Sequence, residues 1–310
     1  MRELIRKIRI IPSALIKKYD NLKNELWKYR IPLKEWSKVE GGYFLNQLNI
    51  TVSADETALL EGYQFAKKIV EYKEGKFTYN AKKQLLLEIA GVKFNINDSE
   101  ELFIINEVFL DQCYNFCTNI SQNVAVIDIG LNVGITSLYF ASRDEVKSVY
   151  SFELFPQTYE LALNNIRLNS FGAKIKAKNT GLSNTSETIV LDYSPKAKGR
   201  MGINGLPYND SFHEVIKQEV TLVDVSKEFM QIKNDNQNTL IICKMDCEGA
   251  EYPILERLFE TRAINLVDGY LIEWHYKDTS EIEKLFMQNG FKTIKTTFPT
   301  MDSGIIYVFK

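Results

Sequence analysis

The sequence is poor in the residues that build disulfide frameworks and metal clusters. Among 310 residues there are only four cysteines and two histidines. Cys113, Cys117, Cys243 and Cys247 form two pairs at i, i+4 spacing, which differs from the C-x-x-C spacing of zinc fingers. We therefore expect free, buried thiols in a reducing compartment and predict a cytoplasmic protein.

Long apolar runs and a charge excess are also absent. No stretch approaches the roughly 20 apolar residues of a membrane span, and the N-terminus lacks the apolar core of a signal peptide. The formal net charge is −2, so the composition does not indicate a nucleic-acid partner. With 45% hydrophobic and 25% charged residues, the chain has a globular composition and room for one large α/β domain plus a smaller appendage.

Residues 1–75 have a mainly helical pattern, which predicts an N-terminal helical extension. Ser53 and Glu56 form a capping-box pattern that predicts the start of one helix. Residues 1–34 hold ten Lys and Arg against three Asp and Glu. This basic segment either makes a peripheral contact with an anionic membrane or presents a solvated face while its apolar stripe packs on the main domain.

Residues 76–310 predict a Rossmann-like domain. A strand pair that turns near Gly91 and a helix over 100–116 come first, and apolar strands then alternate with helices. This order predicts an α/β fold with a doubly wound, mostly parallel sheet, helices on both faces and one antiparallel strand near the end. The predicted strands are 124–129, 148–154, 175–178, 240–245, 270–274, 293–297 and 305–309, and the predicted helices are 135–143, 156–169, 251–260 and 280–288.

The connection over 194–217 is long and rich in Gly and Pro, and it forms either a substrate lid or a plain surface loop.

Two segments place acidic side chains at strand ends, where doubly wound sheets bind ligands. In the first, Asp128 is followed by Gly130, Asn132 and Gly134. The G-x-N-x-G spacing is not the dinucleotide fingerprint, and an acid here suits a ligand that bears a cationic amino acid. In the second, Glu153 is placed to bind both hydroxyls of a ribose. The alternatives are a structural glycine turn and a solvated strand end.

Two further segments concentrate carboxylates at the next strand ends. Asp246, Glu248 and Glu251 lie within six residues, although Glu251 also fits helix capping. Glu273 and His275 end the following strand; a lone histidine is usually structural, but a general base would be useful here. Asp246, Glu248 and Glu273 could instead ligate a divalent cation, an alternative to a site without metal.

Together these segments resemble the FkbM-type methyltransferases, which use S-adenosylmethionine. The resemblance rests on the runs 128–134, 152–153, 244–251 and 273–275 and covers about residues 85–310. It implies a seven-stranded sheet with an antiparallel last strand. It also implies a methionine site and a ribose site, with an adenine site after the third strand. The residues assigned to these sites are Asp128, Gly130, Asn132 and Gly134 for the methionine, Glu153 for the ribose, and Asn179 and Thr180 for the adenine.

The resemblance and the carboxylates predict O-methylation of a small-molecule or glycan acceptor, namely a sugar, a glycan or a hydroxylated metabolite. The sulfonium methyl group is a strong electrophile, so the protein mainly needs to hold an oxygen in line with it. We predict that His275 or Asp246 removes the hydroxyl proton, with Asp246 also beside the cofactor, and that Glu248 and Glu273 bind acceptor hydroxyls. A nucleic-acid methyltransferase and a non-catalytic Rossmann-like binding module are the alternatives.

Overall fold

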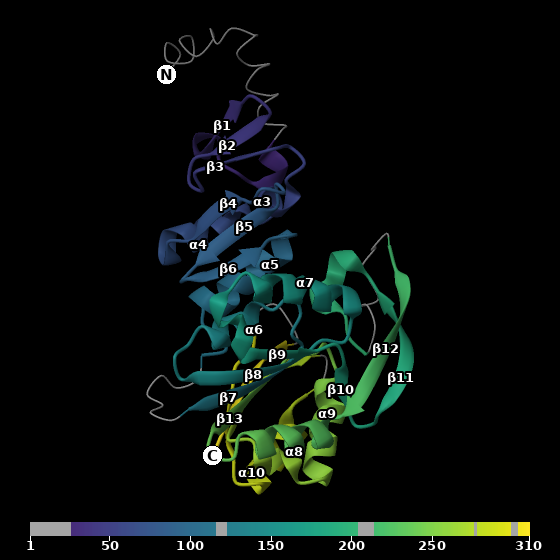
Figure 1. Cartoon of the computed structure of the whole chain (residues 1–310). Coiled ribbons are helices and arrows are strands. Elements are labelled where there is room, and N and C mark those ends of the chain that lie inside the picture. The colour runs from purple at the N-terminus through teal and green to yellow at the C-terminus, as the bar shows by residue number, and fades with distance from the viewer. Residues whose placement is uncertain (1–25, 116–122, 204–213, 276–277, 299–302) are drawn as a thin grey trace, which may run out of the picture. The chain divides into compact units, whose positions relative to one another are not determined.

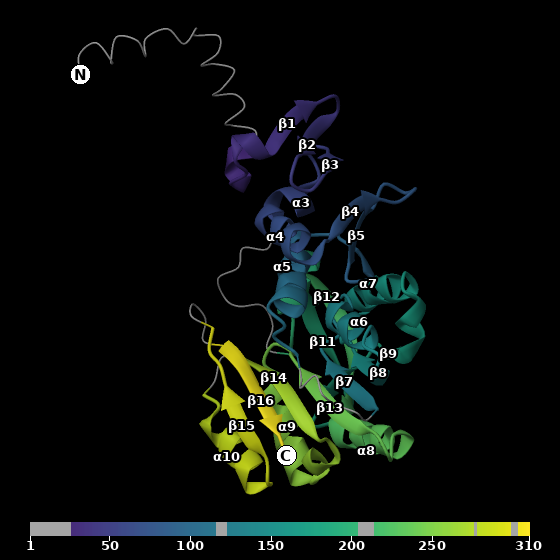
Figure 2. The same cartoon turned by 90° about the vertical axis from the view of Figure 1, so that its left-hand side faces the viewer.

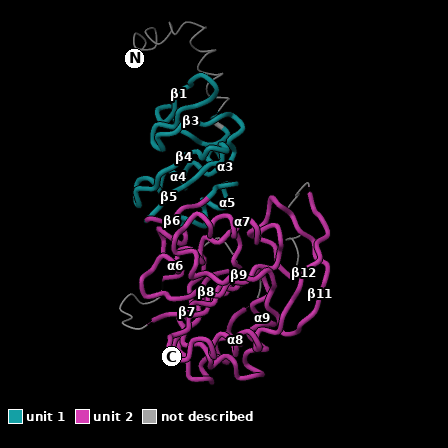
Figure 3. The backbone as a smooth tube through the Cα atoms, in the orientation of Figure 1, with its two compact units in different colours: residues 1–90, 95–106 teal, residues 91–94, 107–310 magenta. Residues whose placement is uncertain are grey.

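The computed structural model describes residues 26–115, 123–203, 214–275, 278–298 and 303–310 (Figure 1). The chain divides into two compact units (Figure 3). The first contains residues 1–90 and 95–106, and the second contains residues 91–94 and 107–310. The predicted division between residues 75 and 76 therefore falls inside the first unit.

The described part of the first unit begins with strands where helices were predicted. After two short 3-10 helices, η1 (Trp27–Tyr29) and η2 (Leu33–Glu35), an antiparallel sheet contains β1 (Trp36–Val39), β2 (Gly42–Leu45) and β3 (Ile50–Val52). The prediction of a helical extension is wrong over residues 36–52. The physical reason is a period of two, because Tyr43 and Leu45 are buried on one face of β2. The basic residues 1–25 lie outside the described residues.

Helices follow this sheet. They are α3 (Thr57–Glu61) and α4 (Tyr63–Lys73). The capping box does not form, since α3 starts after Glu56 and has no side-chain cap. Next come β4 (Lys76–Tyr79), which pairs with β5 (Leu85–Ile89), and then β6 (Val92–Asn95). The predicted strands and the turn at Gly91, where φ is +77°, are confirmed.

The predicted helix over 100–116 is shorter than expected. It forms α5 (Ser99–Ile105), continues as one π-helical turn, η3 (Asn106–Leu110), and then ends. Asp98 caps its start by accepting a hydrogen bond from the backbone N–H of Glu101 at 3.1 Å.

The second unit contains a seven-stranded sheet. Its strands are β7 (Val124–Ile129), β8 (Val146–Phe152), β9 (Ile175–Lys178), β13 (Leu240–Met245), β14 (Gly269–His275), β15 (Lys292–Lys295) and β16 (Ser303–Phe309). Their order across the sheet is β15-β16-β14-β13-β7-β8-β9. Only β16 runs against its neighbours β14 and β15, and Figure 2 shows these strands beside β13. The predicted fold class, a mostly parallel seven-stranded sheet, is confirmed.

Helices cover both faces of this sheet. In Figure 1, α6 (Ile135–Ala141) and α7 (Pro156–Arg167) lie above it, and α8 (Val225–Asp235) and α10 (Ser280–Gln288) lie below, with α9 (Glu251–Glu260) beside them. Phe229, Leu255 and Phe286 from α8, α9 and α10 are at most 1% exposed in a shared core with the strands. Each such side chain contributes about 1.5–3 kcal/mol on burial, which holds these helices on the sheet.

The prediction missed a second, three-stranded sheet in this unit, together with α8. It contains β10 (Gly181–Ser183), β11 (Glu187–Tyr193) and β12 (Ile216–Asp224) in the order β10-β12-β11. A small core of its own anchors this sheet; its residues are Phe155, Tyr193, Ala197, Met201 and Val220. Short 3-10 helices, η4 (Ser170–Lys174), η5 (Pro195–Arg200) and η6 (Ala263–Leu266), complete the unit.

Within the described ranges, no helix combines the length and the apolar character that crossing a bilayer requires.

Candidate functional site

The loop after β7 depends on glycine. Gly130 has φ +85°, and a Cβ placed on it would lie 1.8 Å from the carbonyl oxygen of Asp246. The loops after β7 and β13 therefore touch through their backbones, an approach that a side chain at position 130 would prevent. Asn132 also has positive φ, and Gly134, with φ +89°, is the residue before the first turn of α6.

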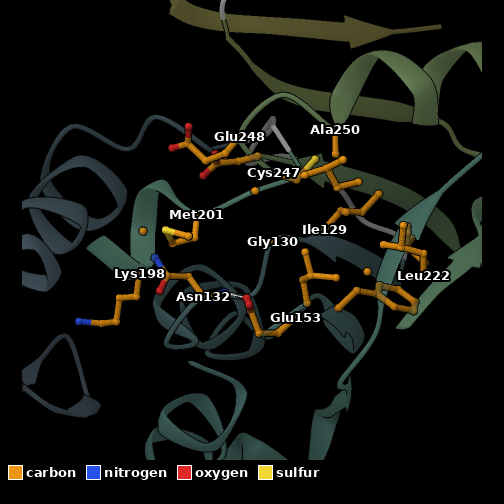
Figure 4. Close-up of a pocket in the computed structure, with 18 residues that line it drawn as sticks. Ile129, Gly130, Asn132, Glu153, Lys198, Met201, Leu222, Cys247, Glu248 and Ala250 are labelled. Carbon is orange, nitrogen blue, oxygen red and sulfur yellow. Dashed lines mark hydrogen bonds between the residues drawn. The ribbon is translucent and has the colours of Figure 1, made fainter. Parts of the chain in front are cut away.

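A pocket opens at the carboxyl ends of β7, β8 and β13 (Figure 4). Five of the predicted site residues line it: Gly130, Asn132, Glu153, Asp246 and Glu248. In Figure 4, Asn132 and Glu153 lie on one side of the cavity, whereas Glu248 lies on the opposite side. The topological switch of the sheet therefore coincides with a cavity, as expected for a doubly wound fold.

The start of the long connection after β11 forms part of the pocket wall. Lys198, Met201 and Gly202 line the cavity. Met201 belongs to the small core of the second sheet, and a Cβ on Gly202 would lie 2.6 Å from the carbonyl oxygen of Glu248. The first part of the predicted lid segment is thus packed against the site, and residues 204–213 lie outside the described residues.

Glu153 is held in place by the backbone. Its Oε2 accepts a hydrogen bond from the N–H of Asn132 at 2.8 Å, and its Oε1 accepts one from the N–H of Phe155 at 3.0 Å. Burial raises the pKa of Glu153 to about 7, against the lowering effect of these bonds. Each carboxylate oxygen keeps a second lone pair, so Glu153 can still accept hydrogen bonds from a ligand in the pocket.

A buried lysine connects the two loops. The Lys244 Nζ donates to the carbonyl oxygen of Gly130 at 2.9 Å and lies 3.2 Å from Asp128 Oδ1 and 3.5 Å from Asp246 Oδ2. The Asp128 side chain is fully buried and also accepts a hydrogen bond from Ser137 Oγ at 2.5 Å. Burial opposes the charge of Lys244, but Asp128 and Asp246 outweigh it and raise the pKa of this lysine. Asp128 therefore supports the loop from beneath rather than lining the pocket.

Hydrogen bonds to Glu251 fix the backbone of the loop 246–251. Glu251 is 1% exposed and accepts hydrogen bonds from the N–H groups of Cys247 at 2.9 Å and Gly249 at 2.7 Å. Glu248 and Gly249 both have positive φ, so the loop between strand and helix is tight. Glu251 thus fixes the conformation that points Asp246 and Glu248 toward the pocket, which goes beyond helix capping.

Beside Asp246 lies a cluster of carboxylates that shares a tyrosine. The Tyr114 hydroxyl donates to Glu273 Oε2 at 2.6 Å and lies 3.3 Å from Asp246 Oδ2. Burial, and then the charge of Asp246, raise the pKa of Glu273 to about 7. Glu107 faces the same charges, and its burial together with Glu273 and Asp246 raises its pKa to about 8.

His275 completes this cluster. Its Nδ1 lies 3.2 Å from Glu251 Oε1, and its Nε2 lies 3.7 Å from Glu273 Oε1 and 3.9 Å from Glu248 Oε1. Burial would lower the pKa of His275, but the hydrogen bond to Glu251 and the charges of Asp246 and Glu248 raise it to about 10. The imidazole is therefore protonated at neutral pH in this state, where it acts as a positive charge and not as a base.

The remaining predicted residues lie close to the pocket without forming its wall. Glu273 and His275 do not line the pocket, and a ligand atom of each lies within 4.8 Å of one of Asp246. Asn179 donates from Nδ2 to the carbonyl oxygens of Glu153 and Leu154 at 2.9 and 3.3 Å. The buried Thr180 hydroxyl has no hydrogen-bond partner among the described residues, and it precedes Gly181, which lines the cavity.

The sequence did not point to Lys244, Tyr114, Glu107 or the wall residues 198–203 as parts of the site. Lys244 lies within the run 244–251, two residues before Asp246, and this position is a signal in the sequence. Tyr114 lies far from every motif along the chain, and only the fold brings it to Glu273.

The pocket also has hydrogen-bonding capacity that the protein does not use. The Asn132 Oδ1 is buried and has no partner within the described part of the chain. Such an atom at a cavity wall is typical of a ligand site. With the glycine loop after β7 and the carboxylate of Glu153 after β8, it fits a nucleoside that carries an amino-acid group. The fold and the site thus define the class of S-adenosylmethionine-dependent methyltransferases with a Rossmann-like sheet.

Comparison with known proteins identifies the family. Residues 128–293, more than half of the chain, match the model of the methyltransferase FkbM domain. The chain therefore belongs to the FkbM methyltransferase family and is an S-adenosylmethionine-dependent methyltransferase, as predicted. Methyltransferase sdnD of Sordaria araneosa is 27% identical over 221 residues, which are 64% of this chain and 85% of that protein. Methyltransferase 1 of Beauveria bassiana is 23% identical over 182 residues, or 55% and 72% of the two chains.

Solved structures with a related fold are more distant. Methyltransferase FkbM from Methylobacillus flagellatus shares 12% identity with a TM-score of 0.41, and the alignment covers 66% of this chain and about half, 48%, of that one. TYW2 of M. jannaschii in complex with AdoMet shares 14% identity with a TM-score of 0.39 and covers 74% and 86% of the two chains.

Proposed function

We propose that this methyltransferase acts on a hydroxyl oxygen of a sugar, a glycan or another hydroxylated small molecule, and that Asp246 removes the hydroxyl proton. The observation that carries the proposal is the position of Asp246, which lines the cofactor pocket and also lies in the cluster with Glu273 and His275. A group that serves methyl transfer must reach both the methyl donor and the acceptor.

Asp246 is better suited to the proton transfer than His275, the other predicted base. The Asp246 side chain is 30% exposed, so a substrate hydroxyl can reach it, and Tyr114 and Lys244 orient it. His275 already carries a proton at neutral pH because its pKa is raised to about 10. We therefore assign His275 the role of balancing the negative charge of the cluster.

Glu248 and Glu273 supply acceptors for the hydroxyl groups of a polyol. Glu248 lies on the pocket wall and Glu273 is held by Tyr114. Pairs of carboxylates bind neighbouring hydroxyls through charge-assisted hydrogen bonds, each worth about 1.5–3 kcal/mol. The same negative cluster would repel a phosphate backbone, which supports a small-molecule or glycan acceptor over nucleic acid.

The cofactor, when bound, supplies an electrophilic methyl group. Gly130 allows the close approach of its amino-acid part, Asn132 offers a buried oxygen, and Glu153 offers a carboxylate for the ribose. Burial of these groups excludes water from the reacting atoms. The free thiols of Cys113, Cys243 and Cys247 support the further proposal of a cytoplasmic location.

Turnover with a panel of hydroxylated acceptors tests this proposal, with release of S-adenosylhomocysteine and the mass of the product as readouts. Asp246→Asn should lower kcat by about 10²–10⁴, the usual contribution of a general base, while S-adenosylhomocysteine binds within a few-fold of wild type. Glu281→Gln, at an exposed position on α10, is the matched control. Methylation at nitrogen or carbon in the product, or full turnover by Asp246→Asn, would contradict the assignment.

A further inference from the structure

Three side chains that could bind a metal ion converge at the ends of β13 and β14. One ligand atom each of Asp246, Glu273 and His275 lies within 4.8 Å of the others. Asp246 follows β13, and the other two come from neighbouring β14, so the sheet itself fixes their spacing. Two carboxylates and one imidazole around a common point form a typical donor set for a divalent metal ion.

Each of these three residues is oriented by a second residue. Tyr114 donates to Glu273 at 2.6 Å, and Lys244 Nζ lies 3.5 Å from Asp246. Glu251, itself fixed by two backbone N–H groups, holds the Nδ1 side of His275 and leaves the Nε2 side directed at the carboxylates. A carboxylate behind a histidine is the usual arrangement that orients a metal-binding imidazole.

The charge around this point is not balanced by the described residues. Glu107 adds a further carboxyl group that interacts electrostatically with Asp246 and Glu273. Lys244 and His275 are the cations in contact with the group. Asp246 and Glu273 are partly buried and repel each other, and a cation bound between them would offset this repulsion.

We propose that Asp246, Glu273 and His275 bind a divalent transition-metal ion such as Mn²⁺. The histidine nitrogen favours such an ion over Ca²⁺, which prefers oxygen ligands only.

The role of this ion rests on the proposed function. Asp246 also lines the cofactor pocket, so an ion bound to it can contact the acceptor oxygen and favour loss of the hydroxyl proton. Asp246 can bind the ion through one carboxylate oxygen and accept the hydroxyl proton on the other. The existence of the site is independent of this role and is measured without any acceptor.

Titration of the metal-stripped full-length protein with MnCl₂, followed by the electron paramagnetic resonance signal of free Mn²⁺, tests the site. One site should remove the free signal at micromolar concentration. Glu273→Gln and His275→Gln should each weaken binding by at least about tenfold, and Tyr114→Phe should weaken it by about tenfold because Glu273 loses its orienting partner. Glu281→Gln on exposed α10 should change nothing.

Pulsed electron paramagnetic resonance of bound Mn²⁺ identifies the histidine ligand directly. The coupling of Mn²⁺ to an imidazole nitrogen should be present in wild type and missing in His275→Gln. Far-ultraviolet circular dichroism and S-adenosylhomocysteine binding show that each variant is folded. The site is refuted if folded wild type binds no Mn²⁺, or if both variants bind it as tightly as wild type. Mn²⁺ binding without methylation of any hydroxylated acceptor would refute the proposed acceptor and keep the site, whereas full turnover in chelator would refute the metal's role.

Discussion

Replacing Lys244 with methionine should destabilise the second unit by about 3–4 kcal/mol at pH 7. The Lys244 side chain is 2% exposed and that of Asp128 is 0% exposed, so the ion pair at 3.2 Å has almost no solvent to replace a lost partner. Lys244→Met leaves the Asp128 carboxylate buried without its cation, the situation in which breaking a buried pair costs about 3–5 kcal/mol. The Gly130 carbonyl also loses its hydrogen bond from Nζ.

Protonation of Asp128 sets a ceiling on this loss. A carboxyl group with an ordinary pKa of 3.8 can be protonated at pH 7 for about 4 kcal/mol, and at pH 5 for about 1.6 kcal/mol, at 1.36 kcal/mol for each pKa unit. In Lys244→Met the folded protein keeps a proton that the unfolded chain has lost above pH 3.8. The loss of stability should therefore grow as the pH rises from 5 to 7.

Urea unfolding monitored by hydrogen exchange in peptides from β7 and β13 measures the stability of the second unit separately from that of the first. The double variant Lys244→Met with Asp128→Asn should recover about 2 kcal/mol relative to Lys244→Met, because no buried charge remains. Lys147→Met, at an exposed position of β8, should stay within about 0.5 kcal/mol of wild type. A loss below about 1 kcal/mol at pH 7, or a loss that does not depend on pH, would refute the reasoning.

Three further predictions concern the cofactor loop, the ribose site and pH. Gly130→Ala should abolish S-adenosylhomocysteine binding in calorimetry, because its Cβ would lie 1.8 Å from the carbonyl oxygen of Asp246. The control Gly290→Ala, at φ +84° with nothing within 4 Å of its Cβ, should bind normally. Equal affinities of the two variants would contradict the contact between the loops. Glu153→Gln should weaken S-adenosylhomocysteine binding by about 10–150-fold, which corresponds to the free energy of a hydrogen bond to a charged group. The control Glu160→Gln, at an exposed position of α7, should bind like wild type. Unchanged affinity of Glu153→Gln would show that Glu153 does not bind the cofactor. Burial raises the pKa of Glu101 to about 7, so the folded protein binds a proton that the unfolded chain loses above about pH 4.5. The stability of the first unit should therefore fall as the pH rises from about 5 to 7.5. In thermal unfolding, Glu101→Gln should show a smaller fall over the same range.

The local sequence pattern was enough to predict the bounds of those helices and strands whose apolar residues are also the buried ones. β7, β9, β13, α9 and α10 have the bounds predicted from sequence, since each is an apolar run or stripe ended by polar residues or glycine. β1, β2 and β3 were missed because short strands between turns can also fit a helical stripe. β11 was missed because most of its residues are exposed or half-buried, which leaves a weak alternation.

The sequence likewise predicted some residues of the candidate site and not others. Gly130, Asn132, Glu153, Asp246 and Glu248 could be predicted because each lies within three residues of the end of an apolar strand. The carboxyl ends of parallel strands meet at one edge of the sheet. The inference that Asp128 lines the cofactor was limited by the same local view. A sequence shows that an acid ends a strand, but not whether its carboxylate faces the cavity or a buried lysine.

The sequence by itself determined the class of fold, the cofactor loop and the concentration of carboxylates at the strand ends, because these follow from periodicity and from residues adjacent along the chain. Only the tertiary structure decided how these groups act on one another. It brought Tyr114 to Glu273 across 159 positions, and it placed Glu251 against His275, whose pKa it raised to about 10. Distances and burial set charge states and donor geometry, and neither quantity is contained in the order of residues along a strand.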